Sequence, residues 1–297
     1  MTIARSADER INWVSSIPFM LVHLMGLVGA GLLVGGWWYG LNMWPELIIC
    51  LVLLYGRMFC ITAGFHRYFS HMSFQLGRVM QFLIALGGTA AAQRGPLWWS
   101  SWHVWHHGHS DQADDVHSPL QQGFWYAHMG WFLARKYQQT LWEAVVRWAQ
   151  FPELVWLDRH YLIPPTVLAT LCAVVGGLFA KGNFLFGALT TVTIGFFLST
   201  VALYHHTYLI NSLTHCWGRR VFPTHDGSRN SLLIAAATLG EGLHNNHHFF
   251  SRCAAQGFVW YEKCFDVTYL MLLFLQSVGL ARGVDGPPPA VLAKRMK

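Results

Sequence analysis

Residues 47–71 read LIICLVLLYGRMFCITAGFHRYFSH, an apolar run that leads directly into two histidines, His66 and His71. Residues 47–63 carry one charge, Arg57, and approach the roughly 20 apolar residues that cross a bilayer as a helix. Histidine is rarely needed at such a position for packing alone, and it is the commonest metal-binding side chain. This stretch therefore predicts a membrane helix with a metal-binding sequence just past its end.

The composition of the whole chain also indicates a membrane protein. Hydrophobic residues make up 54% of the 297 residues and charged residues only 11%, against about 25% charged in a typical globular chain. So few charges cannot cover a soluble surface, and disorder and a nucleic-acid partner are excluded in spite of the net charge of +6. We predict an all-α integral membrane protein with four transmembrane helices, at residues 18–39, 47–63, 162–180 and 184–210.

The placement of basic residues predicts the orientation of these helices. Most Lys and Arg fall on one side of a four-helix arrangement, and the two short loops on the other side hold only Lys181. The positive-inside rule then places both termini in the cytoplasm. Residues 64–161 and 211–282 form a cytosolic catalytic cap, and residues 283–297 a basic, proline-stiffened tail. We expect the shorter apolar stretches 79–92 and 265–281 to be buried or interfacial helices, and the GxxxG of Gly31 and Gly35 to pack closely against another helix.

Histidine is the unusual residue of this chain, with 17 copies gathered in clusters. Residues 103–107 read HVWHH and residues 244–248 read HNNHH, while His215 stands alone after the last predicted span. On a helix, positions i, i+3 and i+4 share a face, so each cluster can act as a unit. One cluster supplies too few ligands for a complete site, and all of them supply more than one metal can use. The pattern predicts two metals, bound by imidazole nitrogens that suit iron, copper or zinc.

Topology provides an independent argument for four spans. If residues 79–92 crossed the membrane, HVWHH would lie on the opposite side from His66, and the clusters could not converge. The remaining histidines have simpler roles: His23 is a packing or hydrogen-bonded residue, and the others are interfacial, surface or supporting residues of the clusters. These others are His109, His117, His128, His160, His205, His206 and His225.

These motifs, in this order, resemble the membrane-bound fatty acid desaturases, and in particular the stearoyl-CoA (Δ9 acyl-CoA) branch with bacterial members. The resemblance covers residues 64 to 283 and rests on GFHRYFSH, WHVWHHGHSD, DDVHSPLQQGFWYAHMGWFLARK, FPELVWLDRHYLIPP, NSLTHCWG, SRNSLL and GEGLHNNHH. It implies four transmembrane helices under a cytosolic cap, a bent tunnel for the acyl chain and a centre of two iron ions. It also implies O2 as co-substrate and an external electron donor of the ferredoxin, rubredoxin or cytochrome b5 type.

The resemblance assigns roles to individual residues. The implied iron ligands are His66, His71, His103, His106, His107, His215, His244, His247 and His248, with Asn211 reaching one metal through water. The implied tunnel residues are Gln93, Thr207 and Tyr208, and Arg135 and Lys136 match positions that meet the coenzyme A head group. Acids beside the histidine clusters are candidates to orient the ligands through their free N–H groups: Asp111, Asp114, Asp115 and Glu241.

The chain departs from this branch at the head-group end. Ser101 and Trp102 stand where animal relatives have an Arg and an Asp that contact coenzyme A, and Val104 replaces the Arg of the second histidine box. We therefore expect an acyl-CoA desaturase in a bacterial inner membrane, but with weaker dependence on the coenzyme A moiety. The alternatives are a related acyl-lipid desaturase or hydroxylase and, more distantly, a metal-binding membrane transporter. A transporter would need polar ligands near the membrane midplane, and only His23 lies well inside a predicted span.

Overall fold

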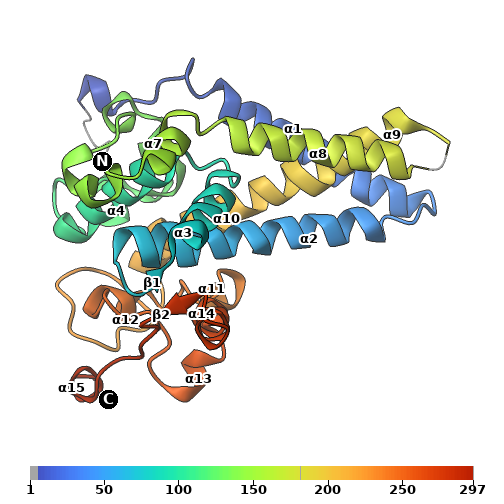
Figure 1. The fold of residues 1–297 in the computed structure, drawn as a ribbon. Coiled ribbons are helices and arrows are strands. Elements are labelled where there is room, and N and C mark those ends of the chain that lie inside the picture. The colour runs from blue at the N-terminus through green and yellow to red at the C-terminus, as the bar shows by residue number, and fades with distance from the viewer. Residues whose placement is uncertain (1–5, 181, 297) are drawn as a thin grey trace.

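The computed structural model describes residues 6–180 and 182–296, and their regular secondary structure is almost entirely helical. Figure 1 shows the long helices lying side by side, with the rest of the chain gathered at one end of them, where both chain ends also lie. The long helices are α1 (Ile17–Trp38), α2 (Trp44–Phe59), α8 (Ile163–Phe179) and the continuous pair α9 (Phe184–Thr190) and α10 (Ser199–Ser212), joined through a π-helical segment, Thr191–Leu198. The rest of the chain therefore caps one end of a helical bundle.

The cap is built from short helices and one two-stranded ladder. Its helices are α3 (Arg78–Thr89), α4 (Pro96–His109), α5 (Pro119–Gln122), α6 (Val146–Ala149), α7 (Pro152–Arg159), α11 (Leu232–Ala237), α12 (His244–Phe249), α13 (Trp260–Lys263), α14 (Val267–Ser277) and α15 (Pro289–Leu292). The antiparallel strands are β1 (Gln75–Leu76) and β2 (Ala281–Arg282). The other 3-10 and π-helical segments are Ala7–Glu9, Cys60–Ser70, Tyr126–Gly130, Trp131–Leu133, Arg135–Tyr137, Trp142–Val145 and Leu213–His215.

Three helical stretches are long and apolar enough to cross a membrane: Ile17–Trp38, Trp44–Ser70 and Phe184–His215. They cover the predicted spans 18–39, 47–63 and 184–210. The predicted span 162–180 corresponds to α8, which alone has 17 residues and joins α7 at a bend of 70°. Only 17% of the apolar 18-residue stretch within Ile17–Trp38 is buried, so most of its apolar side chains face outward, as a lipid-facing helix requires.

The second of these stretches runs further than the sequence suggests. Predicted to end at residue 63, it continues as a π-helical segment to Ser70 and carries His66 on its buried side. π-Helical turns inside α-helices are often found at functional sites, because they rotate the side chains that follow. The predicted short helices are confirmed at 79–92 and 265–281, although α3 and α14 end earlier at Thr89 and Ser277.

The predicted packing role of Gly31 and Gly35 is wrong. A side chain added at either glycine would meet open space. The close contact lies instead at Gly29, where an added Cβ would come within 2.4 Å of the Thr193 carbonyl oxygen. GxxxG spacing places two glycines on one face of a helix, but does not tell which face meets the neighbouring helix.

The C-terminal tail is docked on the cap rather than free. The Arg295 guanidinium bonds the Glu262 carboxylate at 2.5 Å, and the Met296 N–H donates to the Val221 carbonyl at 2.8 Å. The tail over residues 283–297, predicted as a basic, proline-stiffened extension, therefore packs against the cap in its described part, where Arg295 has a buried acidic partner. Lys297, at its end, and Arg5, among the basic residues near the N-terminus, lie outside the described residues.

Candidate metal centre and substrate pocket

Five of the histidines bring their ring nitrogens to one point. His66, His71, His103, His107 and His247 each offer a nitrogen, and these atoms all lie within 4.8 Å of one another. Three Nε2 pairs are separated by only 2.9 Å: His66 with His247, His71 with His103, and His107 with His247. The residues come from the extension of α2, from α4 and from α12, so distant parts of the sequence meet here.

A second group lies beside the first and contains the other four predicted ligands. His106, His215, His244 and His248 also place a nitrogen each within 4.8 Å of one another, and the Nε2 atoms of His215 and His244 are 3.0 Å apart. The Nε2 atoms of His106 and His248 are buried and have no hydrogen-bond partner within the described chain. Buried polar atoms are normally satisfied, so two orphaned nitrogens in one cluster indicate a missing electrophile such as a metal ion.

Four carboxylates hold ligand histidines from behind. Asp115 contacts the Nδ1 of His106 at 2.8 Å, Asp111 that of His215 at 2.8 Å, Asp226 that of His248 at 2.6 Å, and Glu241 that of His66. A carboxylate that accepts a proton from Nδ1–H fixes the tautomer in which Nε2 carries the lone pair. This is the arrangement that orients histidine toward a metal and raises its basicity as a ligand.

Glu241 is itself held by a buried ion network. The Arg67 guanidinium donates to Glu241 at 2.9 Å, forms an ion pair with Asp266 at 2.9 Å and donates to the Ala254 carbonyl at 2.7 Å. Burial would raise the pKa of Glu241, but His66 and Arg67 outweigh it and lower that pKa to about 2. The carboxylate is therefore charged and fixed behind His66 over the physiological pH range.

The electrostatics of the two groups favour neutral imidazoles. Burial, together with neighbouring histidines, holds the pKa well below the usual value for five of them: His71, His103, His107, His244 and His247. Burial likewise lowers the pKa of His248 to about 4, although Asp226 opposes it. Burial also disfavours the charged form of His106, but there Asp115 outweighs it and raises the pKa. Neutral imidazole is the metal-binding form, so the site is preset for ligation.

The residues present therefore fit a pair of transition-metal ions, one per group. Imidazole nitrogen suits iron, copper and zinc, and the carboxylates behind the rings supply compensating negative charge. His106 also lies near Asp115 and His117 in a third, smaller grouping. In that grouping Asp115 already contacts Nδ1 of His106, whose Nε2 faces the second group, so we interpret it as support for the second group.

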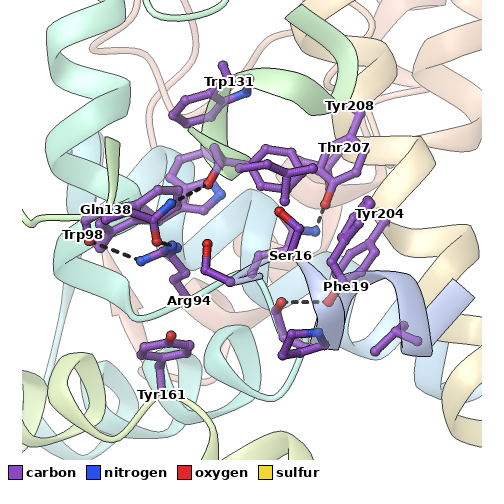
Figure 2. Close-up of a pocket in the computed structure, with 18 of the residues that line it drawn as sticks. Ser16, Phe19, Arg94, Trp98, Trp131, Gln138, Tyr161, Tyr204, Thr207 and Tyr208 are labelled. Atoms are coloured by element: carbon purple, nitrogen blue, oxygen red, sulfur yellow. Dashed lines mark hydrogen bonds between the residues drawn. The ribbon is translucent and has the colours of Figure 1, made fainter. Parts of the chain in front are cut away.

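A largely apolar pocket of about 220 Å³ reaches this centre. Its wall includes His103 and Asn211 at the metal end, and residues from the beginnings of α1 and α8 elsewhere. Figure 2 shows Thr207, Tyr208 and Tyr204 along one side of it and Trp98, Arg94 and Gln138 along the other. The Gln93 amide donates to the Thr207 hydroxyl at 3.0 Å. The three predicted tunnel residues, Gln93, Thr207 and Tyr208, thus line one pocket together with the predicted Asn211.

The predicted head-group residues lie elsewhere. Arg135 is exposed and Lys136 is ion-paired with Glu9 at 2.7 Å, and neither lines the pocket. Ser101 and Trp102, expected near the tunnel mouth, are buried in the packing of the cap. The basic residue that does line the pocket is Arg94. It follows Gln93 directly in the sequence, but a single Arg outside any histidine motif gives no signal that could have singled it out.

Of the four acids predicted to orient the ligand histidines, three contact such a histidine and one does not. Asp111, Asp115 and Glu241 contact ligand histidines, while Asp114 is exposed and offers only its backbone carbonyl, to Trp105. Asp226 was missed because it lies in the loop before the third histidine cluster rather than beside a cluster. His117, assigned to a supporting or surface role, is buried and lines the pocket. The Nδ1–H of His23 donates to the Phe19 carbonyl, 2.8 Å away, in line with its predicted local role.

Comparison with known proteins agrees with this geometry. Residues 42–258 match the fatty acid desaturase family. The chain belongs to that family. The desaturase is 33% identical over 291 residues to the sn-2 palmitoyl-lipid 9-desaturase of Nostoc sp. (strain 36), covering 96% of this chain and 94% of the relative. It is 34% identical to the sn-1 stearoyl-lipid 9-desaturase of Anabaena variabilis, covering 96% and 97%.

Another relative of the desaturase is named for an acyl-CoA substrate. The acyl-CoA C20 Δ5-desaturase of Anemone leveillei is 32% identical over 251 residues, covering 82% of this chain and 75% of the relative. Family membership and an oxidoreductase activity on fatty acyl chains are therefore shown. The assignment to the acyl-CoA branch is not confirmed, because relatives named as lipid desaturases match over nearly the whole chain.

Proposed function

We propose that this desaturase holds two iron ions and introduces a cis double bond, at the Δ9 position, into a saturated acyl chain. In the balanced reaction, R–CH2–CH2–R, O2, two electrons and two protons give R–CH=CH–R and two molecules of water. The observation that carries the proposal is the meeting of nine histidine nitrogens in two adjoining groups of five and four beside an apolar pocket. The ligands are His66, His71, His103, His107 and His247 for one ion and His106, His215, His244 and His248 for the other, with Asn211 acting through water.

The metals would supply the part of the reaction that side chains cannot. Iron with O2 provides an oxidant strong enough for an unactivated methylene C–H bond, which is beyond the reach of ordinary acids and bases. The protein's own contribution is placement. The Gln93–Thr207 hydrogen bond and the aromatic ring of Tyr208 shape the wall beside the metal end of the pocket. A chain lying along that wall would present one carbon pair to the centre while the apolar lining excludes water.

We propose a membrane glycerolipid as the carrier of the acyl chain. Two observations support this choice over coenzyme A. Arg135 and Lys136, the expected contacts for the coenzyme A phosphates, do not line the pocket, and Lys136 already has the Glu9 carboxylate as its partner. In addition, the pocket wall includes Pro18 and Leu162, at the beginnings of two long apolar helices. Acyl-CoA is the second candidate, and the acyl-CoA desaturase among the relatives supports it.

The proposed topology has four spans and a single desaturase domain over residues 1–297. α8, which joins α7 at a bend, supplies the fourth span over residues 162–180, with residues 64–161 and 211–282 forming the cap. The positive-inside rule favours a cytoplasmic cap and cytoplasmic termini, in a bacterial inner membrane. Electrons would come from a ferredoxin, rubredoxin or cytochrome b5 type donor that approaches the cap.

Expression in a host that lacks acyl desaturases tests the proposal. Total lipids are separated by class, and double-bond positions are determined by mass spectrometry after derivatisation. We expect Δ9-unsaturated chains that appear first in glycerolipids. A hydroxylated acyl chain as the product would show that the enzyme is a hydroxylase rather than a desaturase. Early appearance of oleoyl-CoA, before any unsaturated glycerolipid, would favour the second candidate, and no altered acyl chain in cells containing metal-loaded protein would refute the proposal.

A further inference from the structure

Arg94 is a basic residue that lines the pocket, and the function proposed above does not use it. It is half-buried, and its guanidinium lies over the Trp98 ring, 4.7 Å from the centroid, and 5.7 Å from that of Tyr161. Its hydrogen bonds go to the backbone carbonyl and the side-chain oxygen of Gln138. Within the described chain no carboxylate forms a salt bridge with it. The nearby Asp158 is occupied by the N–H groups of Leu97 and Trp98 and by Thr140.

The backbone fixes this side chain in place. Ala92 and Arg94 have positive φ angles of 58° and 67°, which cost free energy in residues other than glycine and persist only where the surroundings impose them. Each residue of the turn is tied to a neighbour: the Ala92 carbonyl accepts from the Tyr204 hydroxyl at 2.7 Å, Gln93 donates to Thr207, and Arg94 donates to Gln138. Figure 2 shows the result, with Arg94 facing the pocket between Trp98 and Tyr161. The cation is thus held ready without an anionic partner.

The position of Arg94 relative to the metal end suggests which part of a substrate it meets. Residues 96 to 103 follow α4 at about 1.5 Å of rise per residue, and His103 and Arg94 both line the pocket. Seven such steps span about 10 Å, a length comparable to the eight carbon–carbon bonds between C1 and C9 of an extended acyl chain. With C9 beside the metals, the carboxyl end of the chain would lie near Arg94.

The residues around Arg94 are of the kind expected where a membrane helix meets the lipid head groups. Ser15, Ser16 and Pro18 come from the beginning of α1, and Tyr161 and Leu162 lie at the beginning of α8. Leu162 is 58% exposed, and Ile17 and Ile163 beside these sites are 47% and 43% exposed. Apolar residues exposed at the ends of two apolar helices are expected at the level where lipid head groups begin. A lipid in that layer could place its acyl chain in the pocket and its head group beside Arg94.

We propose that Arg94 binds the phosphate of a membrane glycerophospholipid and so positions the carboxyl end of its acyl chain. Guanidinium matches phosphate in a bidentate, charge-assisted geometry. In a glycerophospholipid only a few bonds separate the ester from the phosphate, whereas the pantetheine arm carries the phosphates of coenzyme A far from its thioester. The site therefore selects a phosphate close to the ester. This inference rests on the proposed function for the meaning of the pocket, but the binding itself can be measured separately.

The first test is direct binding to purified protein in detergent. The probe is dipalmitoyl phosphatidylglycerol, with monogalactosyl dipalmitoylglycerol as the phosphate-free match, and Trp98 beside Arg94 offers a fluorescence signal. We expect Arg94→Gln to weaken phosphatidylglycerol binding by about tenfold or more, as the loss of a charge-assisted contact implies. Galactolipid binding should change little, and Arg94→Lys should recover part of the affinity. Arg78→Gln, which removes an exposed arginine paired with Glu153, is the matched control.

Turnover by wild type and both variants then separates positioning from a structural role. For phosphatidylglycerol we expect Arg94→Gln to raise KM with little change in kcat, metal content or melting temperature. Equal losses on phospholipid and galactolipid would overturn the proposal, and so would a loss confined to stearoyl-CoA, which would assign Arg94 to coenzyme A. If the wild type desaturates nothing but binds phosphatidylglycerol through Arg94, the proposed function fails and this inference stands.

Discussion

Asp226 offers the sharpest test of how the metal centre is organised. Its Oδ2 lies 2.6 Å from Nδ1 of His248, and its Oδ1 accepts from the backbone N–H and the hydroxyl of Ser228. Replacing Asp226 with Asn keeps the shape but removes the charge. If the amide oxygen stays with Ser228, the amide NH2 faces Nδ1 of His248. That nitrogen must then accept, so the proton moves to Nε2, the atom that faces the ligand group.

The size of the effect follows from these contacts. The opposite amide orientation restores the bond to His248 but places the NH2 against the N–H of Ser228. One orientation therefore loses the Nε2 lone pair that faces the ligand group, and the other loses a hydrogen bond to Ser228. A hydrogen bond to a charged group contributes about 1.5–3 kcal/mol. Removal of a carboxylate behind a metal-bound histidine typically costs about 10–100-fold in metal affinity or activity. We expect Asp226→Asn to fall in this range while still folding, because the carboxylate is partly exposed and its neighbours remain.

The assay measures iron per chain after competition with a chelator of known affinity, alongside desaturation in cells. The control is Asp114→Asn, which removes an equal charge from the same cap at an exposed position whose carboxylate contacts none of the described ligand histidines. The control should retain wild-type iron and activity. If Asp226→Asn also retains both, the carboxylates are not needed to orient the histidines, and the reasoning from Nδ1 contacts is wrong.

Three further outcomes are expected. His103→Ala or His248→Ala should abolish desaturation with normal membrane insertion, whereas His23→Ala should leave activity largely intact. Lipid analysis measures the activity and membrane fractionation the insertion, and wild-type turnover in either ligand variant would remove that residue from the site. Protein from iron-replete cells should contain about two irons per chain by elemental analysis, as its two histidine groups imply, with activity lost on chelation; full activity with one zinc and no iron would contradict this. Gly29→Ala should destabilise the helix pair by about 1–3 kcal/mol, the usual cost of overpacking, and Gly31→Ala should not; equal thermal stability of the two variants in detergent would contradict the packing argument.

The helices and the histidine clusters could be predicted because each leaves a local mark in the sequence. Long apolar runs have few structural alternatives, and HxxHH is rare by chance. The carboxylates were predicted where they adjoin a cluster, as with Asp115, and missed where they do not, as with Asp226. Sequence distance is a poor guide here: Asp111 contacts His215, which lies 104 positions further along the chain. Arg94 drew no prediction, and Lys136 was predicted to meet the coenzyme A head group, because only the fold decides which basic side chain lines the pocket and which meets Glu9.

The HxxHH spacing itself takes on a meaning that the sequence alone does not give. Successive helix residues are rotated by about 100°, so the residues three and four positions after the first histidine lie on either side of it. In α4 the i and i+4 residues, His103 and His107, join the five-histidine group, while His106 joins the other. In α12 the assignment is reversed: His244 and His248 join the four-histidine group and His247 crosses to the first.

Each helix therefore gives a pair to one group and a single histidine to the other. Two helices that share their ligands in this way fix the separation and the orientation of both groups at once. A shift of either helix would disturb both sets of nitrogens together. A pair of histidines on each helix would suffice to bind metal, but the middle histidine of each cluster, His106 or His247, is what couples the two groups into one centre.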